Sequence, residues 1–228
     1  MPPGDFLIQA AGSPAPEVYL HGGELAANNI IDVLQRHDVP LAGDVLDFGC
    51  GCGRVLRRWR NLPGAVPYGC DYNADLARWS RENLPFAKVS INGLTPPAPY
   101  RDAKFDLIYA LGVLAHLPET MQRPWMREFH RMLRPGGHLL VSTHGAHYLP
   151  TLSHAEQRRF NESKLVVRSA RSAGSNLCNA FHPDGYVRRM LTEGFDIVAH
   201  EPRGARGNSE QDLWLLRKLP PEPAVGLG

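Results

Sequence analysis

The chain has few cysteines, no long apolar run and almost no net charge. Its 228 residues include 4 cysteines, and 25 basic side chains stand against 23 acidic ones, for a formal charge of +2. So few cysteines in a chain of this length argue against a disulfide framework and predict reduced thiols in the cytoplasm. No stretch approaches the roughly 18 apolar residues of a membrane span, and no secretory signal is visible. The balanced charge predicts no unselective nucleic-acid binding.

Two common nucleotide-binding motifs are also missing. The P-loop pattern G-x-x-x-x-G-K-[ST] occurs nowhere in the sequence. A dinucleotide fingerprint reads G-x-G-x-x-G, whereas Gly49, Gly51 and Gly53 give G-x-G-x-G, and Arg54 takes the last position. The spacing therefore argues against a nicotinamide oxidoreductase, which stays only as an alternative.

A glycine loop does follow a short apolar run. Residues 45–48 are typical of a buried parallel strand, and the glycines after them let a ligand approach main-chain N–H groups closely. Asp47 would repel a pyrophosphate but can hold an ammonium group. Asp71 ends the next apolar run, where an acid suits the two hydroxyls of a ribose. The pattern predicts a cofactor that carries an amine and a sugar, with few or no phosphates.

The rest of the chain alternates between strand and helix patterns. Apolar spacing predicts helices over 24–37, 55–59, 73–83 and 121–133, and strands over 45–48, 66–70, 88–91, 105–110 and 138–143. We therefore expect a doubly wound α/β fold with a parallel sheet. The runs 195–200 and 212–217 have no helix between them and predict a hairpin with one antiparallel strand. Pro135-Gly136-Gly137 is expected to be the turn that ends the preceding helix.

Three segments are expected to lie outside this alternation, within a single domain over 1–228. Residues 1–22 contain four prolines and predict an irregular N-terminal arm. Residues 220–228 are rich in proline and glycine and predict a flexible tail. The basic segment 145–183 is long for a connection and is expected to form a lid over the ligand cleft.

These motifs together resemble the class I S-adenosylmethionine-dependent methyltransferases. The matching segments are 45–53, 69–73, 105–118 and 133–141, four motifs in order within about residues 20 to 143. The resemblance implies a Rossmann-like, seven-stranded, mostly parallel sheet with an antiparallel C-terminal strand. It also implies S-adenosyl-L-methionine as the cofactor.

The resemblance assigns a role to each motif. Asp47 and the glycine loop would hold the methionine half, Asp71 the ribose, and Tyr72 would stack on the adenine. Asn92 stands where the family often has an acid at the adenine edge, and the segment 110–112 would pass beneath the sulfonium. The implied cofactor-binding residues are Asp47, Gly49, Cys50, Gly51, Gly53, Asp71, Tyr72, Asn92, Gly93, Leu94, Ala110, Leu111 and His116.

Methyl transfer depends mainly on alignment, but a hydroxyl acceptor also benefits from a base that takes its proton. His144 directly follows the predicted fifth strand and is the first choice for this catalytic role; His116, His147 and His182 are alternatives. A metal is not expected, because zinc on Cys50 and Cys52 would distort the glycine loop. No acidic cluster near His144 supports a magnesium-type site.

Motifs that the chain lacks exclude two classes of methyl acceptor. The Asn/Asp-Pro-Pro-aromatic element of aminopurine and glutamine N-methyltransferases is absent after residue 110, and no cysteine follows a proline, as C5-pyrimidine enzymes require. A small-molecule or glycan hydroxyl is therefore the expected acceptor. N-methylation of a small metabolite and a catalytically silent cofactor-binding subunit that supports a partner protein are the alternatives.

Overall fold

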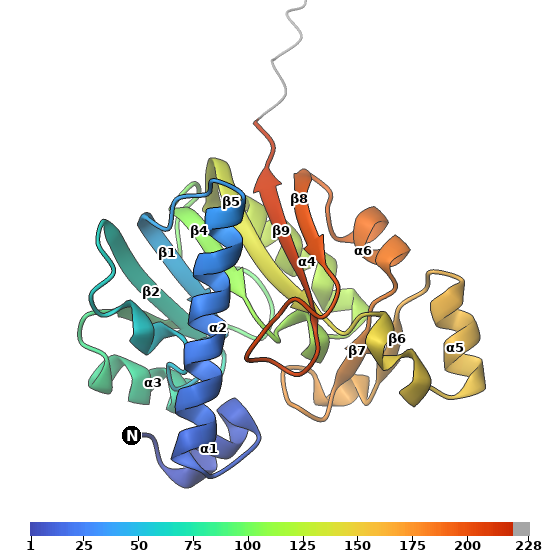
Figure 1. The fold of residues 1–228 in the computed structure, drawn as a ribbon, viewed down its shortest axis with the longest axis horizontal. Helices are drawn as coiled ribbons and strands as arrows, with labels where there is room; N and C mark the ends of the chain where they lie inside the picture. The colour runs from blue at the N-terminus through green and yellow to red at the C-terminus, as the bar shows by residue number, and fades with distance from the viewer. Residues whose placement is uncertain (221–228) are drawn as a thin grey trace, which may run out of the picture.

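One twisted sheet of seven strands, in the order β3-β2-β1-β4-β5-β9-β8, organises the computed structural model, which describes residues 1–220 (Figure 1). The first five strands are parallel, and β9 runs antiparallel between β5 and β8. This arrangement confirms the predicted fold class. The strands are β1 (Gly43–Phe48), β2 (Ala65–Asp71), β3 (Lys88–Ile91), β4 (Phe105–Ala110), β5 (Leu133–Thr143), β8 (Phe195–Glu201) and β9 (Asp212–Lys218).

Helices cover both faces of the sheet. In Figure 1, α2 crosses the near face and α4 lies behind the sheet. The helices are α1 (Gly4–Ala11), α2 (Pro16–Arg36), α3 (Ala74–Asn83), α4 (Glu119–Met132), α5 (His154–Asn161) and α6 (Asp184–Met190), with 3-10 helices η1 (Leu56–Trp59), η2 (Leu114–His116), η3 (Ala146–Thr151) and η4 (Ala170–Ser172).

The central strands are buried on both faces, so each contributes to two cores. Leu46 and Ile108 pack with side chains of α4 and α6, whereas Val45 and Leu107 pack with those of α2, η1 and α3. Side chains alternate across a strand, which explains why the apolar runs are continuous rather than alternating. Each such fully buried side chain stabilises the fold by about 1.5–3 kcal/mol.

The predicted irregular arm is wrong, because residues 4–11 form α1 and α2 already begins at Pro16. Pro3 is the N-cap of α1 and Pro16 occupies the first turn of α2. A helix tolerates proline at these positions, since the missing N–H would have no intrahelical partner there.

The predicted turn at residues 135–137 is also wrong. Helix α4 ends at Met132, and β5 begins at Leu133 and includes the Pro-Gly-Gly sequence. Leu133 pairs with Phe105, and the register then shifts before Leu107 pairs with His138. The extra residues are accommodated as an irregularity within the strand, where Gly136 adopts a φ of 75°.

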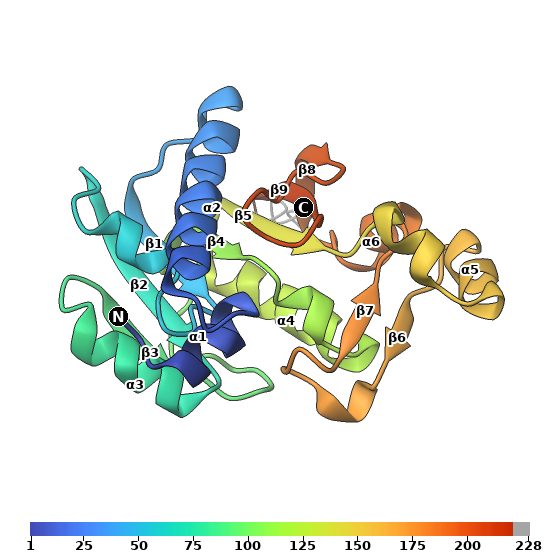
Figure 2. The same cartoon turned by 60° about the horizontal axis from the view of Figure 1, so that its bottom comes forward.

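The segment 145–183 is more regular than a loop. It contains η3, α5 and η4, together with the two-stranded sheet of β6 (Val166–Arg168) and β7 (Asn179–Phe181). Leu152, Phe160, Val166 and Phe181 form a small core of their own. Figure 2 turns the carboxyl ends of the parallel strands toward the viewer, with α1 on one side and this segment on the other. The predicted tail falls on residues 221–228, outside the described residues, apart from Pro220.

Candidate functional site

A cavity of about 1020 Å³ lies at the carboxyl ends of the parallel strands. Its walls come from the loops after β1, β2, β3 and β4, and from α1, the segment 145–183 and the β8–β9 loop. Ligand pockets for one drug-sized molecule measure about 300–1,000 Å³. The volume lies at the upper end of this range and is sufficient for a nucleoside-sized cofactor.

The glycine loop forms one wall because its backbone turns where side chains would collide. Gly49 has a φ of 79°, and a Cβ there would come within 2.6 Å of Val113 Cγ2. The N–H groups of Gly49 and Cys50 both donate to the Cys70 carbonyl, at 2.8 and 3.0 Å. The loop is thus tied to the end of β2, and Gly49, Cys50 and Gly51 all line the cavity.

Asp47 is a buried acid on the wall of this cavity, with 5% of its surface exposed. Burial raises its pKa to about 7, although a hydrogen bond from Tyr109 and the nearby Arg54 guanidinium act in the opposite direction. A cation beside a buried carboxylate stabilises it more than it would stabilise an exposed carboxylate, because water screens the buried pair less. Asp47 therefore suits an ammonium group.

Arg54 is a cavity residue that the sequence analysis did not assign to the site. Its Nη1 donates to the Gly207 carbonyl at 2.8 Å and its Nη2 donates to Asn208 Oδ1 at 2.7 Å. Burial lowers its pKa, and the charge of Asp47 opposes that shift. The sequence signal was its position directly after Gly53, at the end of the glycine loop. In the structure this half-buried residue lines the same cavity as Asp47.

Asp71 holds the glycine loop as well as facing the cavity. Its Oδ2 accepts from the Gly51 N–H and its Oδ1 from the Asn73 N–H, both at 2.8 Å. Burial raises its pKa, and these backbone donors oppose the rise. A carboxylate oxygen has more than one acceptor position, so Asp71 can still accept from ligand hydroxyls.

Tyr72, the residue after Asp71, lies beside it on the cavity wall and contacts the segment 145–183. Its Oη donates to the Gly174 carbonyl at 2.7 Å. A Cβ on Gly174, which has a φ of 83°, would come within 2.7 Å of Leu94 Cδ1 and 2.9 Å of Tyr72 Cζ. The segment 145–183 therefore packs closely against the residues to which the resemblance assigns the adenine.

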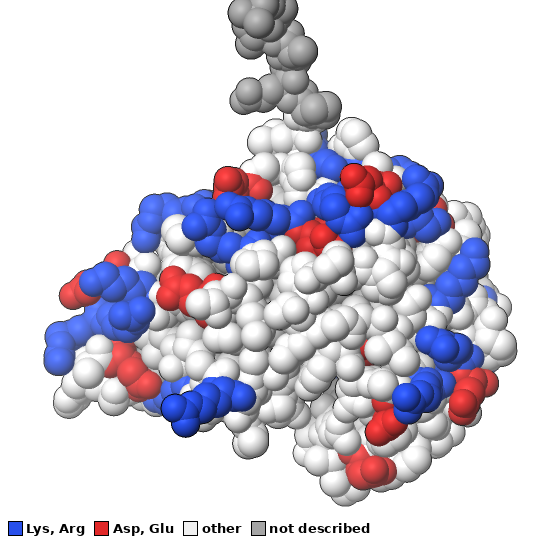
Figure 3. All heavy atoms as spheres, turned by 180° about the vertical axis from the view of Figure 1, so that it is seen from behind, with Lys and Arg blue, Asp and Glu red and all other residues white. Residues whose placement is uncertain are grey.

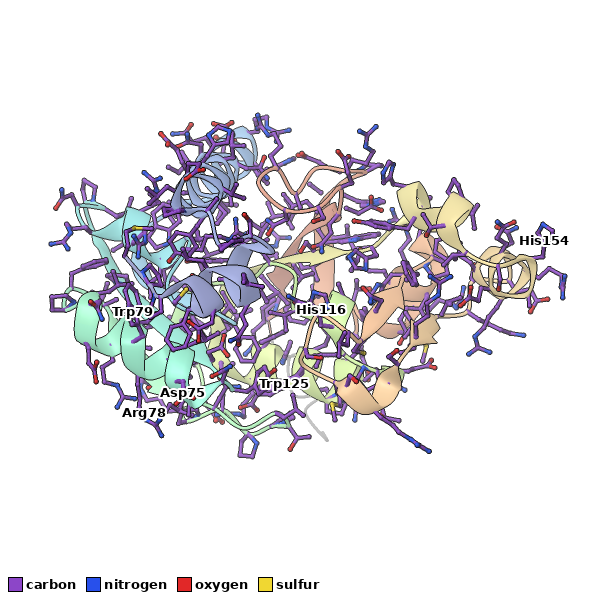
Figure 4. The ribbon with its side chains drawn as sticks, turned by 90° about the horizontal axis from the view of Figure 1, so that it is seen from below. Asp75, Arg78, Trp79, His116, Trp125 and His154 are labelled. Atoms are coloured by element: carbon purple, nitrogen blue, oxygen red, sulfur yellow. The ribbon has the colours of Figure 1, made fainter. Side chains whose placement is uncertain are left out.

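Asn92, another residue to which the resemblance assigns the adenine, provides an unpaired acceptor. Its Nδ2 donates to the Gly93 carbonyl at 2.7 Å, but its buried Oδ1 has no partner among residues 1–220. Buried polar atoms rarely lack a partner, so a ligand N–H is the expected one. Trp125 on α4, a second unassigned cavity residue, donates from Nε1 to the Leu94 carbonyl at 3.0 Å (Figure 4).

These features fit S-adenosylmethionine. Asp47 suits its ammonium group, the glycine loop leaves room beside the main chain, Asp71 suits the ribose and the unpaired Asn92 Oδ1 suits the adenine amine. Two of the residues predicted to bind it, however, do not line the cavity. Gly53 is needed because a Cβ would collide with Leu84, and Ala110 is completely buried in the sheet core.

His144 lines the other end of the cavity, but its ring is held by a buried hydrogen-bond chain. The Gly112 N–H donates to Ser142 Oγ at 2.7 Å, and the Ser142 hydroxyl donates to Gln211 Oε1 at 2.6 Å. The amide Nε2 of Gln211 then lies 3.2 Å from His144 Nε2. An amide nitrogen only donates, so His144 Nε2 is the acceptor and Nδ1 carries the proton.

This polarity argues against the prediction that His144 is the catalytic base. Its Nε2 lone pair is already used, and its Nδ1 is buried without a partner among the described residues. Burial lowers the pKa of His144 to about 4, with the neighbouring His116 adding to the effect. His144 is therefore neutral at pH 7 and a weak base.

Two hydrogen bonds join the segment 145–183 to other walls of the cavity. The Tyr148 hydroxyl of η3 donates to the Ser209 carbonyl in the β8–β9 loop. On the opposite side, Asn176 Nδ2 donates to the Gln9 carbonyl of α1 at 3.4 Å. The segment 145–183 thus spans the cavity mouth from the β8–β9 loop to α1.

No cluster of three or more potential metal ligands occurs within residues 1–220. Over the same range, no helix is both long and apolar enough to cross a membrane. All four cysteines are free and buried.

A sheet of this strand order with such a cavity at its carboxyl edge is the arrangement of class I methyltransferases. A family model described as "Methyltransferase domain" matches residues 21–200. The chain therefore belongs to this family, the class I methyltransferases that use S-adenosylmethionine.

Relatives and solved structures agree with this membership. The chain is 31% identical over 160 residues to the malonyl-[acyl-carrier protein] O-methyltransferase of Enterobacter lignolyticus, covering 68% of this chain and 61% of that protein. It is 30% identical over 139 residues to the probable tRNA methyltransferase 9B of Mus musculus, covering 60% and 28%. The glycopeptide N-methyltransferase MtfA, solved with S-adenosylmethionine, has a TM-score of 0.57 at 18% identity, covering 86% and 94%. The matches span only about 40 to 61% of the length of the first curated relatives.

Proposed function

We propose that this protein transfers a methyl group from S-adenosylmethionine to a hydroxyl of a small molecule or glycan. The observation that carries this proposal is the two-ended cavity, with an acid and glycine cradle at one end and neutral polar and aromatic side chains at the other. The cofactor supplies an electrophilic methyl group on a sulfonium. The protein's own residues bind, align and enclose the two reactants.

At the cofactor end we assign the ammonium group to Asp47 and the ribose to Asp71. Tyr72, Leu94 and Trp125 enclose the adenine, and Asn92 Oδ1 accepts from its amine. Arg54, the half-buried cation of this wall, pairs with the cofactor carboxylate. Asp47 and Arg54 thus each pair with the opposite charge, and Asp71 accepts hydrogen bonds from neutral hydroxyls.

The acceptor end favours a neutral polyol over a strongly charged substrate. Tyr148, Thr151, Asn179 and Phe181 line it, so hydroxyl, amide and aromatic groups face the second ligand. Within residues 1–220, Arg168 is the cation that lines this end, and it is already paired through both Nε and Nη2 with the carboxylate of Glu156, at 2.9 and 2.7 Å. Hydroxyl and amide groups both donate and accept, as sugar hydroxyls require.

The rear surface favours a small acceptor over RNA. Figure 3 shows basic side chains in a band interrupted by acidic ones. The arginines of α4 have acidic partners: Arg123 and Arg127 contact Glu193, and Arg131 contacts Asp102 and Glu128. A surface neutralised in this way gives little of the phosphate attraction on which RNA binding depends.

The other sequence-based alternatives stay as alternatives. N-methylation of a small metabolite fits the same cavity, and a catalytically silent cofactor-binding subunit would share the cofactor end. The cytoplasmic location stays a prediction.

Calorimetry with S-adenosylhomocysteine and with NAD tests the cofactor half of the proposal. We expect a single site for S-adenosylhomocysteine and no heat from NAD. Mass spectrometry of S-adenosylmethionine reactions with separate pools of sugars, small alcohols, amines and total tRNA then tests the acceptor. Methylation confined to tRNA or to amines would contradict the hydroxyl proposal, and binding without any methylation would favour the silent subunit.

A further inference from the structure

Four histidines were candidates for the base, and the structure separates them by position. His147 is exposed and does not line the cavity, while His182 is buried away from it. His144 lines the cavity, but its ring is committed to Gln211. His116 is the remaining candidate on the cavity wall.

The His116 ring has the opposite arrangement from His144. Its Nδ1 lies 2.8 Å from the Cys178 carbonyl oxygen. A carbonyl can only accept, so Nδ1 carries the ring proton in the neutral ring and Nε2 carries the lone pair. His116 Nε2 has no hydrogen-bond partner among residues 1–220. The ring is partly exposed in the cavity, so this lone pair is available to a ligand.

The main chain and neighbouring rings fix the orientation of His116. Its carbonyl accepts from the Gly174 N–H at 2.8 Å, which ties η2 to the lid segment. The His144 ring packs at 89° to it with 6.1 Å between centroids. Figure 4 labels His116 and Trp125 near the middle of the view onto this edge.

His116 also belongs to the loop that would pass beneath the sulfonium. Leu111 and Gly112 line the cavity after β4, and η2 carries His116 a few residues later. If this loop passes beneath the sulfonium, as the resemblance implies, a base carried on η2 is close to the transferred methyl group.

We propose that His116 Nε2 is the base that takes the acceptor's proton, and that Gln211 and Ser142 hold His144 as a neutral wall residue. This inference rests on the proposed hydroxyl acceptor. The acceptor O–H proton moves to His116 Nε2, the O–CH₃ bond forms, and the S–CH₃ bond breaks with its electron pair left on sulfur. The products are the methyl ether, S-adenosylhomocysteine and a protonated His116.

Two titratable residues contact or neighbour His116: His144, whose ring packs against it, and Cys178, whose carbonyl holds Nδ1. Burial raises the pKa of the Cys178 thiol, so it stays neutral at pH 7. His144 is neutral there as well.

The first test needs no acceptor. In ¹⁵N-histidine NMR of the full chain with S-adenosylhomocysteine, His116 is assigned by comparison with His116→Asn. We expect the neutral His116 ring as the Nδ1–H tautomer, and His144 unprotonated at Nε2 and not titrating above pH 5. A neutral His116 ring that carries its proton on Nε2 overturns the inference. Failure of S-adenosylhomocysteine to bind contradicts the proposed function instead.

The second test uses the hydroxyl acceptors found in the pools, grouped by their acidity. We expect His116→Asn to lower kcat about 10²- to 10⁴-fold for alcohols and much less for phenols that ionise without help. The control is His154→Asn, an exposed residue on α5 that Figure 4 places at the outer end of the molecule, and it should leave kcat unchanged. An equal loss for alcohols and phenols would show that His116 only shapes the cavity, and full activity of His116→Asn would exclude it as the base.

Discussion

Replacing Asp47 with Asn should stabilise the cofactor-free protein while weakening cofactor binding. The carboxyl is buried beside Tyr109, and its pKa is about 7 against an ordinary value of 3.8. Each pH unit of difference is worth about 1.4 kcal/mol, so the buried ionised group destabilises the fold by about 4 kcal/mol above pH 7. Asn has nearly the same shape and carries no charge.

The sign of the effect depends on pH. Below pH 3.8, Asp47 is protonated in both the folded and the unfolded chain, so the group has no effect. As the pH rises toward 7, the unfolded chain ionises first and the folded state loses stability. Asp47→Asn should therefore raise the free energy of unfolding by up to about 4 kcal/mol at pH 8 but only about 1.5 kcal/mol at pH 5.

Urea unfolding at pH 5, 6.5 and 8 measures this difference, and calorimetry measures the binding of S-adenosylhomocysteine. The lost charge-assisted hydrogen bond should weaken binding about 10- to 100-fold. Asp75→Asn is the matched control, because Asp75 is exposed on α3 and paired only with Arg78 (Figure 4). A gain that does not change with pH, or an unchanged affinity, would refute the assignment of Asp47.

Three further perturbations test the walls of the cavity. In wild type, the affinity for S-adenosylhomocysteine should rise with pH up to about 7 and then level off. Binding of the ammonium group requires ionised Asp47, and burial raises the pKa of Asp47 to about 7. Calorimetry of Asp47→Asn should show no such rise, and a flat wild-type profile would contradict the role of Asp47. Gly174→Ala should weaken the same binding about tenfold, because its Cβ would meet Leu94 and Tyr72; unchanged affinity in fluorescence titration would mean that the lid does not cover the adenine. Asn92→Leu removes the unpaired acceptor and should lower affinity about 10-fold, whereas a cofactor analogue lacking the adenine amine should bind both proteins equally; the same 10-fold loss with that analogue would disprove the contact.

The central strands were predictable because they are buried on both faces and form continuous apolar runs. The runs 88–91 and 105–110 match β3 and β4 residue for residue, since glycine and proline bound the apolar segments. Helix α1 was missed because its prolines occupy positions that a helix tolerates, which composition alone does not distinguish from an irregular arm.

The sequence could predict a cavity residue only where its position depends on its neighbours in the chain. Asp47, Gly49 and Asp71 follow from strand ends and loop geometry, and they line the cavity. Gly53 has the same spacing but packs against Leu84, a contact that depends on α3. The choice between His116 and His144 depends on the Cys178 carbonyl and on Gln211, which are 62 and 67 residues away in the chain.

The most direct measurement is to follow the methyl group itself. The protein is incubated with [methyl-¹³C]S-adenosylmethionine and the pooled small-molecule acceptors, and the products are examined by ¹³C NMR. We predict a new O–CH₃ resonance in a small hydroxyl compound, formed together with one equivalent of S-adenosylhomocysteine. A methyl group found only on nitrogen or only in RNA, or no transfer at all while the cofactor binds, would contradict this function.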